Sequence, residues 1–176
     1  MKSISQFLNN RTPKEEVEAM VHYVSENPEE IPHFIEALKT DDYTQNQQAG
    51  WVIGKLGELS PFELLPYIGD FIEILEMPRI DGVHRNVWRG LQFVDIPEEF
   101  KGPMLEIGLQ HFEDQQAKVA IRVFALKTIT PLVEEHPELI DEIRAIVDYS
   151  WKNSTPGFKS ITRNTLKKWD KQKWDE

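Results

Sequence analysis

The stretch that decides the fold is QQAGWVIGKLGEL, which runs from Gln47 to Leu59. Its apolar residues recur at spacings of three and four and share one narrow arc of a helical wheel: they are Ala49, Val52, Ile53 and Leu56. Three glycines, at positions 50, 54 and 57, lie outside that arc. Each glycine inside a helix costs about 0.5–1 kcal/mol relative to alanine. A neighbouring helix packed closely against the glycines is the expected compensation, so the stretch predicts a helix inside a tight stack.

The same stretch has the outline of a phosphate-binding loop, because a glycine precedes the pair Gly54-Lys55. Such a loop needs four residues between its glycines and a Ser or Thr after the lysine to bind magnesium. Here three residues separate Gly50 from Gly54, and Leu56 follows the lysine. The preceding residues, DDYTQNQQA, are polar rather than a buried strand. We therefore interpret the glycines as structural.

The length, cysteine content and net charge of the chain limit the classes of protein to which it can belong. The chain has 176 residues, no cysteine and a formal net charge of −10. It is long enough to bury a sizeable core, and we expect a single domain over residues 1–176. The N-terminus lacks an apolar signal region and no stretch approaches 18 apolar residues, so we expect a cytoplasmic protein without a membrane span. The negative charge opposes nonspecific binding to nucleic acid or anionic lipid.

Almost the whole chain has helical periodicity, and no segment alternates as a strand does. Prolines preceded by capping residues mark several helix starts, as at Thr12-Pro13 and Ser60-Pro61. Pro131 is expected to kink or end its helix. The signals predict about nine helices, joined by short linkers into antiparallel pairs. Their ranges are 13–26, 28–40, 43–59, 61–76, 82–95, 97–113, 114–134, 137–152 and 156–170.

An internal repeat follows from equivalent residues in successive helices. Leu56, Leu91 and Leu126 are 35 residues apart, and Ile72 and Ile107 repeat the same interval in the alternate helices. A period of 35 to 40 residues with two helices per unit is typical of an α-solenoid.

The chain resembles HEAT (ARM/HEAT) repeat proteins in four segments, which are YTQNQQAGWVIGKL, VHRNVWRGLQFV, KVAIRVFALKTI and PGFKSITRNTLKKW. The resemblance implies an all-α, right-handed α–α superhelix in which second helices line the concave side. Residues 28–170 would form four helical pairs, with 13–26 as an N-terminal cap and 171–176 as a loose tail that includes Trp174. Gln48 stands where many HEAT repeats have an arginine.

The layout is also similar to a family of short bacterial HEAT-like proteins that is sometimes mislabelled adenylosuccinate lyase. The lyase signature SSxMPxKxN is absent from the sequence, so we reject that activity.

The sequence offers no catalytic or metal-binding constellation. None of the five histidines lies three or four residues from another. The paired carboxylates, such as Glu15-Glu16 and Glu98-Glu99, sit in first turns, where the helix dipole explains them. We therefore expect a non-enzymatic protein with no cofactor, no metal and no catalytic residue.

Charge is divided unevenly along the chain. The central spans of the second helices, 44–57, 82–94, 115–130 and 156–168, contain no Asp or Glu. They contain ten basic residues: Lys55, Arg85, Arg89, Lys118, Arg122, Lys127, Lys159, Arg163, Lys167 and Lys168. If these helices share the concave side, a cationic groove results. The alternative is that each cation pairs with an acid of a neighbouring repeat.

The groove hypothesis predicts a monomeric scaffold whose partner is an acidic protein segment. Trp51 lies opposite its helix's apolar stripe, so it is either an exposed anchor in the groove or packed against the next repeat. The candidate groove residues are Trp51, Lys55, Arg85, Arg89, Lys118, Arg122, Arg163 and Lys167.

Nucleic acid is the alternative partner, by similarity to HEAT-like alkylpurine DNA glycosylases, which carry a catalytic aspartate on their groove helices. The absence of acids from the central spans argues against base excision but not against backbone binding.

Overall fold

The computed structural model describes residues 3–172, with side chains described through Asp170. This range contains ten α-helices and three 3-10 segments, and it contains no strand. The α-helices are α1 (Ile4–Leu8), α2 (Lys14–Glu26), α3 (Ile31–Leu38), α4 (Tyr43–Leu59), α5 (Ile68–Glu76), α6 (Asp81–Leu91), α7 (Glu98–Glu113), α8 (Val119–Glu134), α9 (Ile140–Trp151) and α10 (Pro156–Gln172). The 3-10 segments are η1 (Pro28–Glu30), η2 (Pro61–Tyr67) and η3 (Pro137–Leu139).

The predicted helices correspond to these elements, with differences at proline. Three predicted helices begin as the 3-10 segments η1, η2 and η3, each with proline in its first turn. Helix α8 continues for three residues beyond Pro131, so the proline does not end it. Helix α1 was not predicted, although its signal is present. The Ser3 hydroxyl accepts a hydrogen bond from the Gln6 backbone N–H, and the Gln6 side chain accepts one from the Ser3 N–H, both at 3.2 Å.

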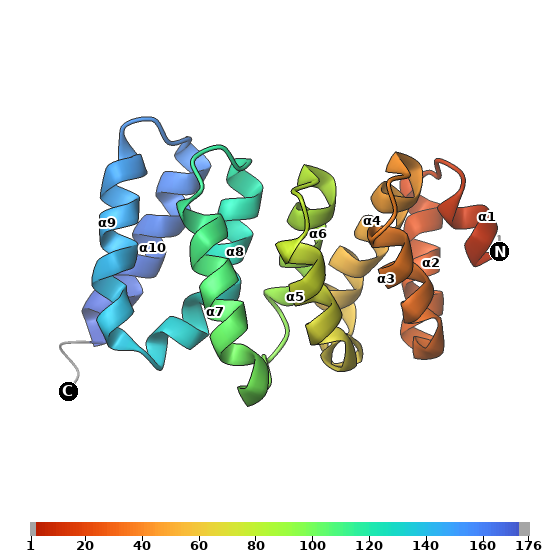
Figure 1. Ribbon diagram of the computed structural model, residues 1–176, viewed down its shortest axis with the longest axis horizontal. Coiled ribbons are helices and arrows are strands. Elements are labelled where there is room, and N and C mark those ends of the chain that lie inside the picture. The colour runs from red at the N-terminus through yellow and green to blue at the C-terminus, as the bar shows by residue number, and fades with distance from the viewer. Residues whose placement is uncertain (1–2, 173–176) are drawn as a thin grey trace.

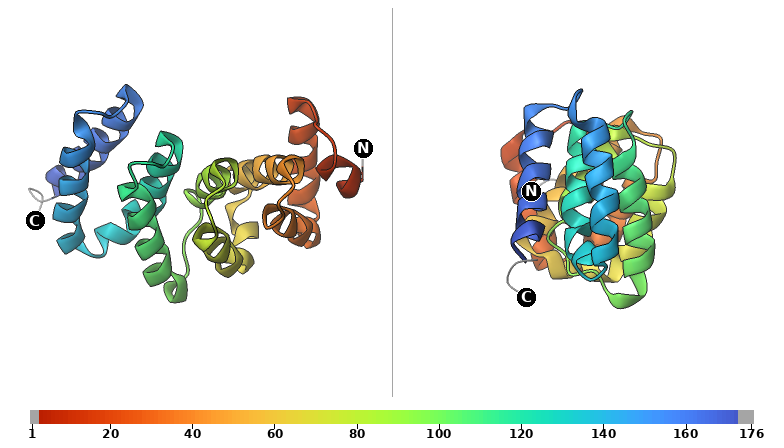
Figure 2. Two further views of the ribbon diagram at one scale, coloured as in Figure 1. Left: turned by 45° about the horizontal axis from the view of Figure 1, so that its top comes forward. Right: turned by 90° about the vertical axis from the view of Figure 1, so that its left-hand side faces the viewer.

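The helices form two rows (Figure 1). The first helices α3, α5, α7 and α9 face the viewer, and the second helices α4, α6, α8 and α10 lie behind them. Each second helix packs on the next, and α2 extends this row at its N-terminal end because it packs along α4. The row is curved, with the second helices on its inner side (Figure 2). The described chain is therefore an all-α, HEAT-like solenoid, as the repeat period predicts. The predicted tail, 171–176, lies mostly outside the described residues, as does Trp174.

Two hydrophobic clusters fill the space between the rows. One extends from Phe7 to Leu132 along the chain and the other from Phe112 to Trp169, and α8 contributes side chains to both. Trp88 and Trp169 are fully buried, whereas Trp151 is half-buried at the edge of the second cluster. Stacking of repeats thus buries residues that a single helical pair would leave in water.

The glycines of α4 lie where the backbone of α6 comes closest. A Cβ at Gly57 would overlap the backbone of Gly90, and a Cβ at Gly90 would lie 2.9 Å from the carbonyl oxygen of Ile53. At Gly54 the nearest atom would be the carbonyl oxygen of Asn86, at 3.1 Å. The prediction that these glycines permit close helix packing is confirmed. No described helix combines the length and the apolar character that crossing a bilayer requires.

Candidate functional site

Three cations of the first row, Lys39, Lys101 and Arg144, are neutralised by carboxylates of the next repeat or of their own helical pair. The Nζ atom of Lys39 lies 3.1 Å from Asp70 and that of Lys101 lies 2.8 Å from Glu135. Hydrogen bonds to Glu135 and Glu98 raise the pKa of Lys101 above its ordinary value. Arg144 of α9 pairs in the same way with Asp170 of α10. The Lys39 contact joins one repeat to the next, and the other two join the two helices of one pair. None of these three side chains therefore carries a free positive charge.

The second row keeps one exposed or half-buried stripe on each helix, opposite its buried arc. We call these stripes together the second-helix face. Its members are Glu18 on α2, Trp51, Lys55 and Glu58 on α4, Arg85 and Arg89 on α6, Phe124 and Lys127 on α8, and Arg163 and Lys167 on α10. Within each helix the members are three or four residues apart, so they lie above one another on one side.

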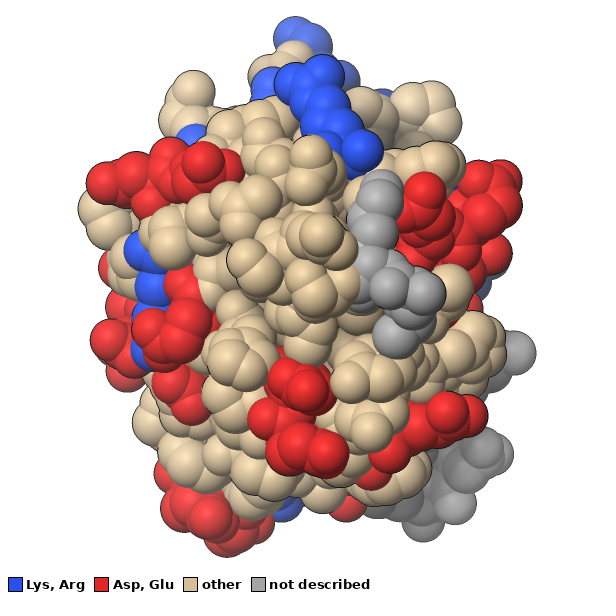
Figure 3. Space-filling view, turned by 90° about the vertical axis from the view of Figure 1, so that its right-hand side faces the viewer, with Lys and Arg blue, Asp and Glu red and all other residues tan. Residues whose placement is uncertain are grey.

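The N-terminal half of the second-helix face is neutral. Lys55 Nζ lies 3.1 Å from Glu18, whose pKa is lowered by this hydrogen bond and by the lysine's charge. Arg89 lies 3.3 Å from Glu58. The predicted acid-free groove is therefore incomplete here, because α2 belongs to the same row and supplies Glu18, and the last turn of α4 supplies Glu58. Acidic residues also cover more of the N-terminal end of the molecule than basic residues do (Figure 3).

The other cations of the second-helix face are unpaired. Four cations are exposed and have no described carboxylate within ion-pair distance: Arg85, Lys127, Arg163 and Lys167. Lys127 lies over the ring of Phe124, 5.8 Å from its centroid, so its contact is with an aromatic face rather than with an acid. These side chains can donate charged hydrogen bonds to an anionic partner.

Three other predicted residues are placed differently. Trp51 is half-buried and packs against the first hydrophobic cluster, while part of its ring stays on the second-helix face. Lys118 is exposed and unpaired among the described residues, but it is the N-cap of α8 and lies at the edge of the row. Lys168, at the end of the basic series, is paired with Glu134 at 2.6 Å.

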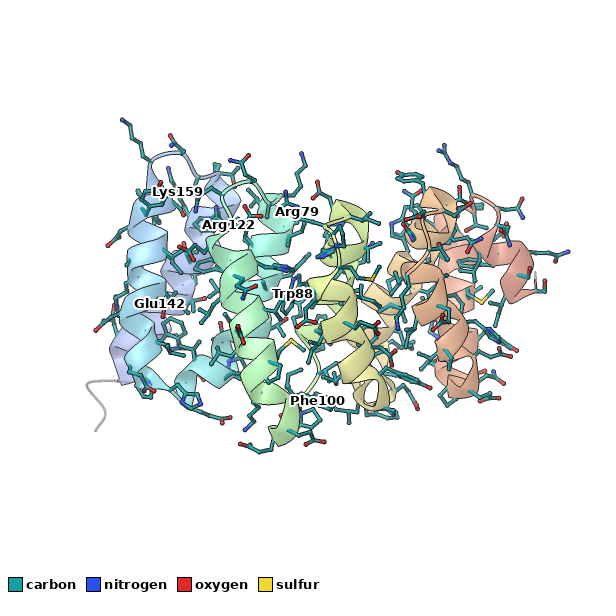
Figure 4. All side chains as sticks on the ribbon, in the orientation of Figure 1. Arg79, Trp88, Phe100, Arg122, Glu142 and Lys159 are labelled. Carbon is teal, nitrogen blue, oxygen red and sulfur yellow. The ribbon has the colours of Figure 1, made fainter. Side chains whose placement is uncertain are left out.

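Arg122 is inside the protein, at the junction of α7, α8 and α9 (Figure 4). Only 4% of its surface is exposed. Its guanidinium donates to the carbonyl oxygen of Phe112 and to Ser150 Oγ, each at 2.8 Å, and lies 4.5 Å from the ring centroid of Phe158. Burial lowers its pKa. A side chain enclosed in this way cannot contact a ligand on the surface, so Arg122 has a structural position.

A polar cluster lies between α6 and α7, around the labelled Trp88 in Figure 4. Trp88 Nε1 donates a 2.8 Å hydrogen bond to His111 Nδ1, and the rings of His84 and His111 have centroids 5.3 Å apart. Burial, and then the neighbouring His84, lower the pKa of His111 to about 4. Burial also lowers the pKa of His84. Both imidazoles are therefore neutral at pH 7, and His111 acts as a hydrogen-bond acceptor.

This cluster predicts acid sensitivity. An unfolded histidine has a pKa of about 6.5, so below that pH the unfolded chain binds a proton that native His111 does not. Stability must then fall as the pH falls from 7 to 5, by about 1–2 kcal/mol for His111. Urea unfolding at several pH values measures this. His111→Gln should reduce the slope while the exposed His22→Gln keeps it, and an unchanged slope in His111→Gln would contradict the assignment.

The described residues offer no metal site, because nowhere in residues 3–170 do three His, Asp or Glu side chains gather in a suitable arrangement. What the site can do chemically is present cations, with aromatic rings beside some of them, along one side of a rigid stack. Such a surface recognises anionic groups.

Comparison with known proteins agrees with the architecture. The HEAT repeat domain family matches residues 4–169. Searches of curated proteins and of solved structures gave no match. HEAT repeats generally serve as protein-interaction scaffolds and are typically non-enzymatic. Because the match runs from α1 into α10 and the helices stack as paired repeats, the chain belongs to the HEAT repeat family.

Proposed function

We propose that this protein is a non-enzymatic interaction scaffold that binds an acidic protein segment on its second-helix face. The observation that carries the proposal is a contrast between the two rows. The first-row cations Lys39, Lys101 and Arg144 each contact a carboxylate, whereas Arg85, Arg163 and Lys167 contact none among the described residues. A cation that pairs with a carboxylate of its own or a neighbouring repeat is explained by the fold, but a row of cations without a carboxylate is not.

The geometry of the stack favours an extended segment. Packed helices have axes about 8–10 Å apart, and an extended chain advances about 3.3 Å per residue. Every third residue of such a segment would therefore meet a successive second helix. The unpaired cations occur on α6, α8 and α10, so acidic residues spaced by about three positions match them. Because α8 contributes to both hydrophobic clusters, we also propose that the stack acts as one domain and functions as a monomer.

We predict that neutralising the unpaired cations weakens acidic-peptide binding about tenfold. An exposed ion pair contributes roughly 0.5 kcal/mol, so three lost contacts amount to about 1.5 kcal/mol. The test variant is Arg85→Gln with Arg163→Gln and Lys167→Gln. Fluorescence anisotropy with a labelled peptide carrying glutamate at every third position measures the affinity, and a glutamine version of the peptide should not bind.

The charge-matched control neutralises the paired cations, as Lys39→Gln with Lys101→Gln and Arg144→Gln. It changes the net charge by the same amount and should keep the affinity within about twofold. Equal weakening in both variants would mean that only net charge matters. Tighter and more salt-dependent binding of a DNA or RNA duplex than of the peptide would replace the proposal with a nucleic-acid partner.

A further inference from the structure

A small cavity of about 330 Å³ opens between the N-terminal ends of α4 and α6. Tyr43 and Gln47 of α4 form one wall, and the first turn of α6, from Asp81 to Val83, forms another. The rest of the lining is Asn46, Ile80, Arg85 and Asn86. Tyr43 is 64% exposed and Ile80, beside the first turn, is 36% exposed, so the entrance has apolar sides. The volume suits one side chain of a partner better than a large cofactor.

The first turn of α6 presents unused hydrogen-bond donors to this cavity. Its N-cap is Ile80, which has no side-chain acceptor, and no side chain caps the helix. The first helical bond is from His84 N–H to the carbonyl oxygen of Ile80, at 3.0 Å. Among the described residues, the backbone N–H groups of Asp81, Gly82 and Val83 therefore have no acceptor. Such groups, at the positive end of a helix dipole, favour an anion.

Asn86 gives an independent sign of a missing ligand. It is only 3% exposed, and its side chain makes no hydrogen bond with any described residue. The amide lies over the backbone of Gly50, where a Cβ would come within 2.9 Å of Asn86 Nδ2. Since Asn86 lines the cavity, its residual exposure is toward that space. Among the described residues, the side-chain polar atom that is enclosed without a partner is Gln48 Nε2, so the amide atoms of Asn86 remain reachable from the cavity and can bond to a molecule there.

The charged side chains around the cavity favour a ligand that carries a single negative charge. The Arg85 guanidinium is unpaired among the described residues, whereas Asp81 Oδ1 is held by Arg79 Nε at 3.2 Å. Arg79 also contacts Asp114. The Asp81 carboxylate is therefore partly compensated but still opposes a dianion. One guanidinium, one amide and three backbone N–H groups match a carboxylate, which accepts several hydrogen bonds with a single charge.

We propose that this cavity binds the carboxylate of an Asp or Glu side chain, with Arg85, Asn86 and the first turn of α6 as donors. The inference that this carboxylate belongs to a bound protein segment rests on the proposed function. The cavity would then fix the register of that segment on the second-helix face, because it accepts one acidic residue in one place.

The test titrates the protein with sodium acetate at constant ionic strength and follows ¹H–¹⁵N spectra. The amide protons of residues 81–83 and the side-chain amide of Asn86 should shift in a saturable way. Gly82→Asp places a competing carboxylate in the cavity, where an added Cβ meets nothing within 4 Å. It should reduce these shifts at least fivefold and raise the melting temperature, because an acid in the first turn stabilises a helix. Arg85→Gln should also weaken acetate binding.

The matched control is Gly102→Asp, which adds the same charge at another helical glycine with open space around its Cβ. It should leave the acetate shifts unchanged. Absence of a saturable shift, or equal shifts in Gly82→Asp and the natural sequence, would overturn the inference. Inorganic phosphate that binds at least tenfold more tightly than acetate would overturn the assignment to a carboxylate.

Two outcomes separate this inference from the proposed function. If the acidic peptide binds Gly82→Asp as well as it binds the natural sequence, the scaffold proposal stands and the pocket inference fails. If acetate binds at residues 81–83 but no acidic peptide binds, the pocket stands and the scaffold proposal fails.

Discussion

Gly57→Ala is expected to destabilise the protein by about 2–4 kcal/mol, more than any surface substitution. The added Cβ would overlap the backbone of Gly90 on α6, and a backbone cannot rotate away as a side chain can. Helices α4 and α6 would have to separate, which also loosens the packing of Ile53 and Leu56. The gain in helix propensity, at most about 1 kcal/mol, is too small to offset this. Chemical denaturation followed by circular dichroism measures the change.

Gly102→Ala is the control for this prediction, because it is also a helical glycine but its Cβ would meet nothing within 4 Å. It should stabilise the protein by about 0.5–1 kcal/mol through helix propensity alone. A stabilising effect at both positions would mean that the α4–α6 contact is looser than described.

Arg122→Ala is expected to cost about 3 kcal/mol. The substitution removes the packing of the guanidinium against the rings of Phe112 and Phe158 and leaves the Phe112 carbonyl oxygen without its side-chain donor. Since a buried polar group without a partner is costly, the loss exceeds that of an exposed arginine. Urea unfolding should show it, together with an altered near-ultraviolet signal from the aromatic residues of this cluster.

Two variants separate the causes of this loss. Arg122→Met keeps much of the packing but removes the hydrogen bonds, so its stability should lie between those of the natural sequence and Arg122→Ala. Arg163→Ala, at an exposed arginine, should change stability by less than about 0.5 kcal/mol. An Arg122→Ala variant as stable as Arg163→Ala would contradict the interior role.

Helix positions and repeat spacing were predictable because they depend on local signals. The apolar arc of α4 and its three glycines indicated both a helix and a close neighbour, and the structure has α6 in that place. The capping box of Ser3 and Gln6 was an equally local signal for α1 that the prediction missed. The sequence also contained a signal for the interior position of Arg122, in its place on the helical wheel. On a helical wheel it lies within the apolar arc of α8, about 140° from the exposed Lys127.

The sequence by itself determined that this chain is a stack of paired helices, because periodicity, capping and glycine spacing act within one or two turns. Only the tertiary structure decided which cations are free. Lys55 meets Glu18 from a helix 37 positions away, while Arg85 meets no described acid. The cavity beside α6 likewise exists only where the ends of two second helices come together. Charge pairing acts through space over a few ångströms, so its outcome depends on how repeats pack rather than on the order of residues within any one of them.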